Sequence, residues 1–124
     1  MTTEHEVSVI DREPSACAAL DDELGSISVV GDGTDPGVLS KAGANRADVL
    51  IATTRSDGDN LVACQLAKHR FGAARTISVV SISDHERLFN MLGIDVTINT
   101  TELIVGKIQE ESLKILVEKV GSLG

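Results

Sequence analysis

Two aspartates follow apolar segments in positions where a carboxylate could bind a sugar or a base. Asp11 comes directly after the apolar run Val7–Ile10, and Asp32 follows the run Ile27–Val30 after one glycine. If both runs are parallel strands, both carboxylates lie at carboxyl ends of strands, where open α/β sheets bind ligands. Asp11 could accept both hydroxyl protons of an adenosine ribose, and Asp32 could accept a bond from an adenine amino group. The alternative for Asp11 is a turn or helix N-terminal carboxylate ahead of Pro14.

Residues beside these aspartates extend the candidate site. Arg12 could lie over an adenine or meet a phosphate, and a solvated arginine is the alternative. Gly31 and Gly33 flank Asp32 and could let a flat base approach the backbone. An ordinary strand-to-helix turn ahead of Pro36 explains the two glycines equally well.

A third polar segment follows the apolar run Val49–Ala52. Thr53 and Thr54 are small residues whose hydroxyls could reach a ribose or a phosphate. The helix expected from Ser56 attracts anions to its N-terminus, but the carboxylates that follow Ser56 oppose a phosphate. Arg55 could offset part of that charge.

No residue pattern indicates catalysis or a metal site. The three histidines, His5, His69 and His85, lack metal-ligand spacing, and there is no GxSxG nucleophile motif. Cys17 and Cys64 are far apart in apolar stretches, which is typical of buried free thiols. We therefore expect no catalytic residue and no metal ligand.

Composition restricts the class of protein. The chain has 124 residues, 42% of them hydrophobic and only 2% aromatic, so we expect one domain with an aliphatic core. A formal net charge of −8 opposes binding to nucleic acid and to anionic lipid. The sequence has no run of apolar residues long enough to span a membrane and no signal-peptide pattern, which predicts a cytoplasmic protein without direct membrane insertion.

Short apolar runs alternate with helical patterns along the chain. Helices are expected to begin at prolines or at capping boxes and to end at glycines. The expected strands are Val7–Ile10, Ile27–Val30, Val49–Ala52, Ile77–Ile82 and Val96–Ile98. The expected helices begin at Pro14, Pro36, Ser56 and Ser83, end at Gly25, Gly43, Gly72 and Gly93, and are followed by one from Thr101 to about Lys119. This order predicts an α/β fold with a parallel sheet and right-handed crossovers.

The three strand-end motifs occur together in a known order. They are Val-Ile-Asp-Arg at 9–12, Gly-Asp-Gly-Thr-Asp-Pro at 31–36 and Ala-Thr-Thr at 52–54. With Ala-Gly-Ala at 42–44 and Leu-Gly-Ile-Asp-Val at 92–96, they resemble the TrkA-N domain, also called KTN or RCK. That family regulates potassium transporters and channels, and the similarity runs from about His5 to Gln109.

The resemblance implies a cytosolic regulatory domain that binds NAD(H) or an adenine nucleotide (AMP, ADP or ATP) without chemistry. By that analogy Asp11 faces the ribose, Gly31-Asp32 approaches the adenine, and Thr53 lies near the ribose or phosphates. Residues 1–100 would form the nucleotide-binding domain, and 101–124 a helix that crosses to a second subunit. The implied partners are a homodimer or higher oligomer and a membrane potassium transporter or channel subunit, which would hold the domain peripheral to the membrane.

The sequence departs from the family pattern at two places. Family members open with a strand, a GxGxxG turn and a helix before the equivalent of Glu6, and these are lacking here. Since that turn holds the pyrophosphate, we expect weakened dinucleotide binding. The sheet of about five strands would lack its central strand, so the strands at Val7 and Val49 either pair directly or leave a gap for a second polypeptide. A truncated gene start is the other explanation. Val79 replaces an arginine that many relatives carry.

Two other functions remain open at this point. A fragment of an NAD-linked oxidoreductase would share the fold, but such an enzyme needs an acid–base residue near the nicotinamide, and the chain has no tyrosine. The third hypothesis is that the chain is a dimerisation module that has lost its ligand. Thermal stabilisation by a nucleotide would separate it from a nucleotide sensor.

Overall fold

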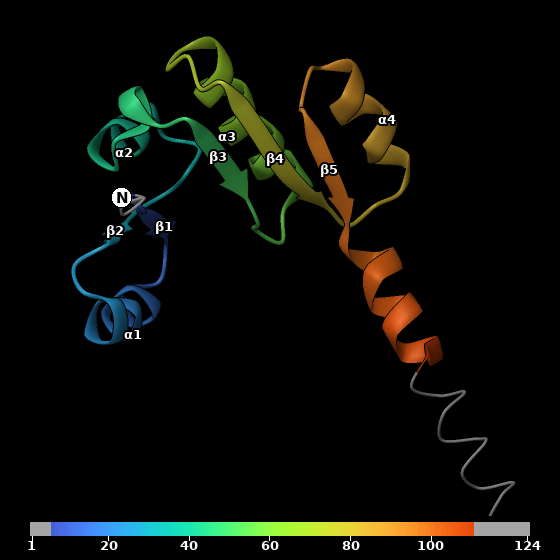
Figure 1. The fold of residues 1–124 in the computed structure, drawn as a ribbon, viewed down its shortest axis with the longest axis horizontal. Helices are drawn as coiled ribbons and strands as arrows, with labels where there is room; N and C mark the ends of the chain where they lie inside the picture. The colour runs from blue at the N-terminus through green and yellow to red at the C-terminus, as the bar shows by residue number, and fades with distance from the viewer. Residues whose placement is uncertain (1–5, 111–124) are drawn as a thin grey trace, which may run out of the picture.

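Five β-strands alternate with helices in the computed structural model, which describes residues 6–110. The elements are β1 (Val9–Asp11), α1 (Pro14–Leu24), β2 (Ser28–Val30), α2 (Pro36–Lys41), the 3-10 helix η1 (Ala44–Arg46), β3 (Val49–Ala52), α3 (Asp57–His69), β4 (Arg75–Val80), α4 (Asp84–Met91) and β5 (Val96–Asn99). Figure 1 shows their arrangement. The predicted α/β class is confirmed, and η1 is the one element that the sequence pattern did not indicate.

The strands form two parallel sheets rather than one. β1 pairs only with β2, and β3, β4 and β5 follow one another in a separate sheet. Of the two arrangements expected for the strands at Val7 and Val49, the structure has the one in which they do not pair. Consequently β1 and β3 each keep one edge without a hydrogen-bonded neighbour in the described chain.

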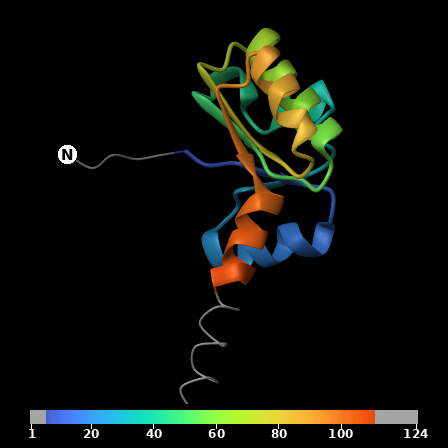
Figure 2. The same ribbon diagram turned by 90° about the vertical axis from the view of Figure 1, so that its right-hand side faces the viewer.

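The core lies on one face of the three-stranded sheet, under α3 and α4. Its buried cluster consists of Ala52, Cys64, Val80, Phe89 and Ile94. Figure 2 shows α3 and α4 on the same side of this sheet. The alternate residues of β3 point to the other face, where Val49 and Ile51 are 44% and 61% exposed. The described helices therefore cover this sheet on one face only.

The signals that end the helices are confirmed. Gly25, Gly43, Gly72 and Gly93, where the four helices were expected to stop, are the glycines with positive φ in the described chain. Half of the capping box predicted at Ser56 is confirmed, since the Ser56 hydroxyl accepts a bond from the Asp59 amide at 3.1 Å. The Ser56 amide donates to the Thr54 hydroxyl at 3.2 Å rather than to the Asp59 side chain.

The capping box predicted at Ser83 is wrong. Ser83 already has helical dihedral angles, φ −56° and ψ −37°, and its side chain makes no cap hydrogen bond. Instead its hydroxyl accepts a bond from the side-chain amide of Asn99 at 3.0 Å. The Ser83 side chain therefore joins α4 to the end of β5.

Three strand boundaries differ from the prediction by two residues: the start of the first strand and both ends of the fourth, which begins at Arg75 rather than Ile77. The first strand is Val9–Asp11, because its partner β2 has only three residues. The fourth strand ends at Val80 rather than Ile82. It ends there because the amides of Ser81 and Ile82 donate to the carboxylate of Asp57 at 2.9 and 3.1 Å, instead of extending the strand ladder.

Residues 100–110 continue as a helix after β5 and project away from the sheet (Figure 1). From residue 101 to residue 110 every residue is exposed, including Leu103, Ile104 and Ile108. The remainder of the expected terminal helix lies outside the described residues. Within residues 6–110, no helix is long and apolar enough to cross a membrane.

Gly31 should be intolerant of any side chain. A Cβ at Gly31 would lie 2.8 Å from Cγ2 of Val38, whose branched side chain has little rotamer freedom in α2. We expect Gly31→Ala to lower the free energy of unfolding by about 1–3 kcal/mol in urea denaturation. Gly33→Ala is the matched control, because a Cβ there meets nothing within 4 Å and should change stability by less than about 0.5 kcal/mol. Equal stability of the two variants would contradict this packing.

Candidate nucleotide site

The predicted site residues lie at the carboxyl ends of strands, as parallel pairing requires. Asp11 ends β1 opposite Val30, and its carbonyl accepts a bond from the Gly31 amide at 2.9 Å. Asp11, Arg12 and Asp32 therefore share one edge of the two-stranded sheet. Thr53 follows the last residue of β3, at the corresponding edge of the other sheet.

The two aspartates differ in how much of each carboxylate is already bonded. Asp11 accepts one bond, from the Glu13 amide to Oδ1 at 2.8 Å, and nothing in the described chain reaches its Oδ2. Asp32 accepts from the amide and the hydroxyl of Thr34 at 2.8 and 2.7 Å, and pairs with Arg12 at 2.9 Å. Asp11 thus has the greater capacity to bind a ribose hydroxyl.

The bonds to Asp32 keep its carboxylate ionised. The amide of Thr34, then its hydroxyl, then Arg12 lower the pKa of Asp32 from 3.8 to about 2. The ionised carboxylate fixes the loop after β2, since it closes a turn onto Thr34 two residues ahead.

Gly31 and Gly33 adopt no conformation that is reserved for glycine, because neither has a positive φ. Gly31 is required instead by the contact with Val38, which packs α2 against the end of β2. Gly33 has open space where a Cβ would lie, so a ligand could approach the chain at that point.

The two threonines after β3 have different surroundings. The Thr54 hydroxyl donates to the Asn60 side chain at 2.6 Å, and the Thr54 amide donates to the same oxygen at 3.0 Å. Thr53 is exposed and makes no side-chain hydrogen bond in the described part of the chain. Thr53 is therefore available to a ligand, whereas Thr54 holds the turn.

A cavity of about 380 Å³ opens beside these threonines, at the carboxyl ends of β3 and β4. Its lining residues are Thr53, Thr54, Arg55, Asp57, Val79, Ser81 and Thr100. Val79 is part of this wall. Arg55 is exposed and has no ion-pair partner among residues 6–110.

Two buried polar residues that position this cavity were missed by the sequence analysis. Asn60 is fully buried, and its amide donates to the carbonyls of Thr54 and Val79, both at 3.1 Å. Asp57 is 7% exposed and accepts from Ser81, Ile82 and, at 2.9 Å, Nδ1 of His85. Burial raises the pKa of Asp57, but the bonds from these residues outweigh it and lower the pKa overall.

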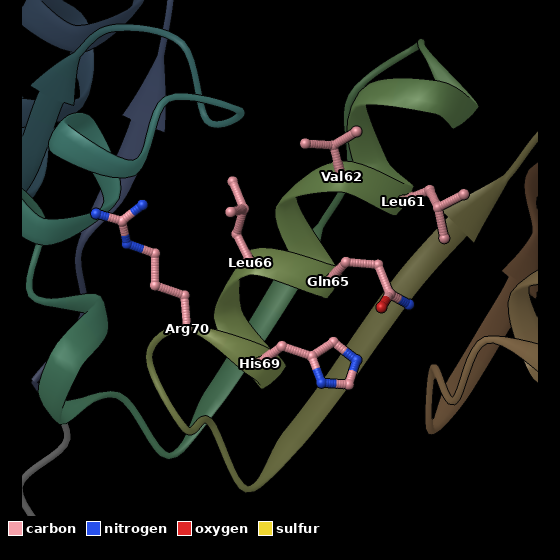
Figure 3. A pocket seen from close by; sticks show the side chains of 6 residues that line it. All are labelled: Leu61, Val62, Gln65, Leu66, His69 and Arg70. Carbon is pink, nitrogen blue, oxygen red and sulfur yellow. The ribbon is translucent and has the colours of Figure 1, made fainter.

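A second hollow, of about 470 Å³, lies on the outer surface of α3 and contains none of the predicted site residues. Figure 3 shows its lining side chains on successive turns of that helix, which are Leu61, Val62, Gln65, Leu66, His69 and Arg70. The surface that it exposes is mainly apolar and therefore offers the polar groups of a nucleotide few hydrogen-bond partners. The polar edge at Asp11, Asp32 and Thr53 is the better candidate.

The two halves of the candidate site are joined by Arg12. Its Nη2 lies 2.9 Å from Oδ2 of Asp32 and 3.0 Å from Oδ2 of Asp59, in the first turn of α3. Asp11 and Asp32 make no direct hydrogen bond to Thr53 in the described structure. Arg12 is thus the side chain that connects the edge of one sheet to the helix that follows the other.

Parallel strands, crossover helices and polar residues at the carboxyl edge define a Rossmann-like α/β domain. The chain belongs to the TrkA-N domain family, whose family model matches residues 1–100. It is 34% identical over 106 residues to a Trk system potassium uptake protein TrkA homolog of Methanothermobacter thermautotrophicus, a match covering 86% of this chain and 49% of that protein. The chain thus spans about half the length of this relative.

Solved structures share the fold. The TrkA-N domain of the inner membrane protein YbaL from Escherichia coli superposes with a TM-score of 0.75 at 16% identity, covering 85% of this chain and 77% of that one. A structure of the GsuK channel bound to NAD has a TM-score of 0.66 at 26% identity, covering 76% of this chain and 17% of that one. The family assignment made from the strand-end motifs is confirmed.

The turn in which Asp32 accepts hydrogen bonds from Thr34 makes the stability of the fold sensitive to acid. Because its folded pKa of about 2 lies below the unfolded value of 3.8, Asp32 stabilises the fold above pH 3.8, and this stabilisation is lost as pH falls toward 2. We expect the melting temperature of Asp32→Asn to be lower than that of the wild type at pH 6, and the difference to shrink across that interval. Asp22→Asn, an exposed change in α1, should follow the wild type throughout. A difference that does not vary with pH would contradict the assignment.

Proposed function

We propose that this chain is a nucleotide-sensing regulatory domain of a potassium uptake or channel system, and that it binds an adenine nucleotide, or NAD(H) more weakly, without chemistry. The observation that carries the proposal is the carboxyl edge. It presents the open Oδ2 of Asp11, the exposed hydroxyl of Thr53 and the open surface at Gly33. Membership of the TrkA-N family and the likeness to the GsuK channel solved with NAD support the same conclusion.

The residues have separate roles in this proposal. Asp11 accepts the ribose hydroxyls through the oxygen that has no partner in the described chain. The loop at Gly31, Asp32 and Gly33 approaches the adenine, with Asp32 held in place by Thr34. Thr53 lies on the far side of the site, toward the ribose or phosphates.

The described residues offer no arrangement that would favour an oxidoreductase over a sensor. The hydrogen bonds of Asp57 and His85 are directed at backbone and hydroxyl groups of the β4–α4 turn and at each other. A buried carboxylate with four such bonds holds a turn in place rather than transferring a proton. We therefore assign the domain a binding function.

We also propose that residues 101–124 mediate association with a second copy of the chain. In the described part of this segment Leu103, Ile104, Val105 and Ile108 are between 46% and 61% exposed. Four apolar side chains within two turns of a helix require a partner surface. The docked dimer would be held to the membrane by a potassium transporter or channel subunit.

Isothermal titration calorimetry with AMP and with NAD tests the ligand assignment. We expect Asp11→Asn to weaken AMP binding about 10-fold or more, because a charge-assisted hydrogen bond to the ribose is lost. The variant keeps the oxygen that accepts from Glu13, so the fold should persist. Asp22→Asn, on the surface of α1, should bind AMP as the wild type does. Unchanged affinity in Asp11→Asn would contradict the site.

Potassium uptake in cells that encode the same two variants tests the physiological role. We expect Asp11→Asn to remove the response of uptake to adenine-nucleotide level, and Asp22→Asn to retain it. Identical uptake in both strains would contradict a role in potassium transport even if the purified protein binds AMP.

A further inference from the structure

Arg12 lies between the proposed adenosine contacts at Asp11 and Asp32 and the part of the site that contains Thr53. Its guanidinium reaches Asp32 beyond β2 and Asp59 in the first turn of α3, at 2.9 and 3.0 Å. The side chain is 62% exposed, so solvent and solutes reach it. A guanidinium has five N–H donors, which exceeds what these two contacts use.

The carboxyl edge needs a cation before it can accept a phosphate. Asp11, Asp32 and Asp59 place three carboxylates around this position, and Asp57 adds a fourth at the cavity wall. Arg12 is the cation that lies among these carboxylates, directly after Asp11.

The two carboxylates that hold Arg12 are not equivalent. Asp32 is fixed by the amide and hydroxyl of Thr34, so its position does not depend on Arg12. The side chain of Asp59 has Arg12 as its one hydrogen-bond partner in the described structure. An arriving anion that competes for the guanidinium would therefore displace Asp59 and leave Asp32 in place.

We propose that Arg12 is the phosphate-binding residue of the adenine-nucleotide site, and that a bound phosphate takes the place of Asp59. This inference rests on the proposed function. Arg12 follows Asp11 in the chain and its side chain reaches across to α3, so its planar guanidinium could bind two phosphate oxygens of a nucleotide whose ribose lies on Asp11. Because Arg12 also joins β1 to α3, phosphate binding breaks the ion pair that connects the two halves of the domain at this edge.

Calorimetry with adenosine and AMP on three variants tests this role. For the wild type we expect AMP to bind at least about 10-fold more tightly than adenosine. Arg12→Gln should reduce AMP affinity to that of adenosine, with adenosine binding unchanged. Asp59→Asn should raise AMP affinity several-fold, because the competing carboxylate is gone, again without an effect on adenosine.

The comparison of Arg12→Gln with Asp59→Asn separates recognition from structural damage. Both variants break the same ion pair, so a structural role would move AMP affinity in the same direction in both. Arg55→Gln removes the other cation of this edge and should leave the ratio of AMP to adenosine affinity as in the wild type. If Arg55→Gln loses the preference for AMP over adenosine and Arg12→Gln keeps it, the inference is overturned. If the wild type binds adenosine and AMP equally, only the role of Arg12 is overturned. If the wild type binds neither, the proposed function is overturned as well.

Discussion

The separation of β1 from β3 is the constraint on which the rest of the structure depends. Each of these strands is paired on one edge only, so no ladder of hydrogen bonds joins the two sheets. The sheets are connected by α2 and η1 along the chain and by two ion pairs, Glu6–Arg46 ahead of the strands and Arg12–Asp59 beyond them. Exposed ion pairs of this kind contribute about 0–1 kcal/mol each. Their weakness means that a ligand binding at the carboxyl edge can change how the halves are coupled.

The acidic edge and its arginine follow from this constraint. Asp11 and Thr53 lie at the carboxyl ends of β1 and β3, and no strand in the described chain pairs with both of these strands. Arg12 is the side chain that crosses between them, by way of Asp59. Under the proposed function, Arg12 would both bind the phosphate of a nucleotide and connect the two halves of the domain.

Local sequence signals predicted the elements well. The apolar runs identified all five strands, and the four glycines expected to end helices have positive φ, a conformation that glycine adopts at the lowest steric cost. The strand-end motifs located Asp11, Asp32 and Thr53 correctly at the carboxyl edge, since parallel strands bring these ends together. These features depend on residues that are close in sequence.

The features that the sequence did not reveal depend on residues far apart in sequence. Asp57 and Asn60 are polar residues of the kind expected in an exposed first turn of a helix. Both are buried instead, because they form hydrogen bonds with Ser81 and Val79, which lie about 20 residues later in the sequence. The end of β4 is set by the same Asp57 contacts. The bridge from Arg12 to Asp59, across 47 residues, likewise has no local signature.

NMR mapping of amide chemical shifts during an AMP titration shows whether the carboxyl edge binds an adenine nucleotide. We expect saturable shifts at Asp11, Arg12, Gly31 to Gly33 and Thr53, which lie at the carboxyl ends of strands in both sheets and around the Arg12 bridge. The amides of the outer surface of α3, around Leu66 and His69, should remain unchanged. Shifts confined to that surface of α3, or no shift at any amide of the carboxyl edge, would contradict nucleotide binding at this edge.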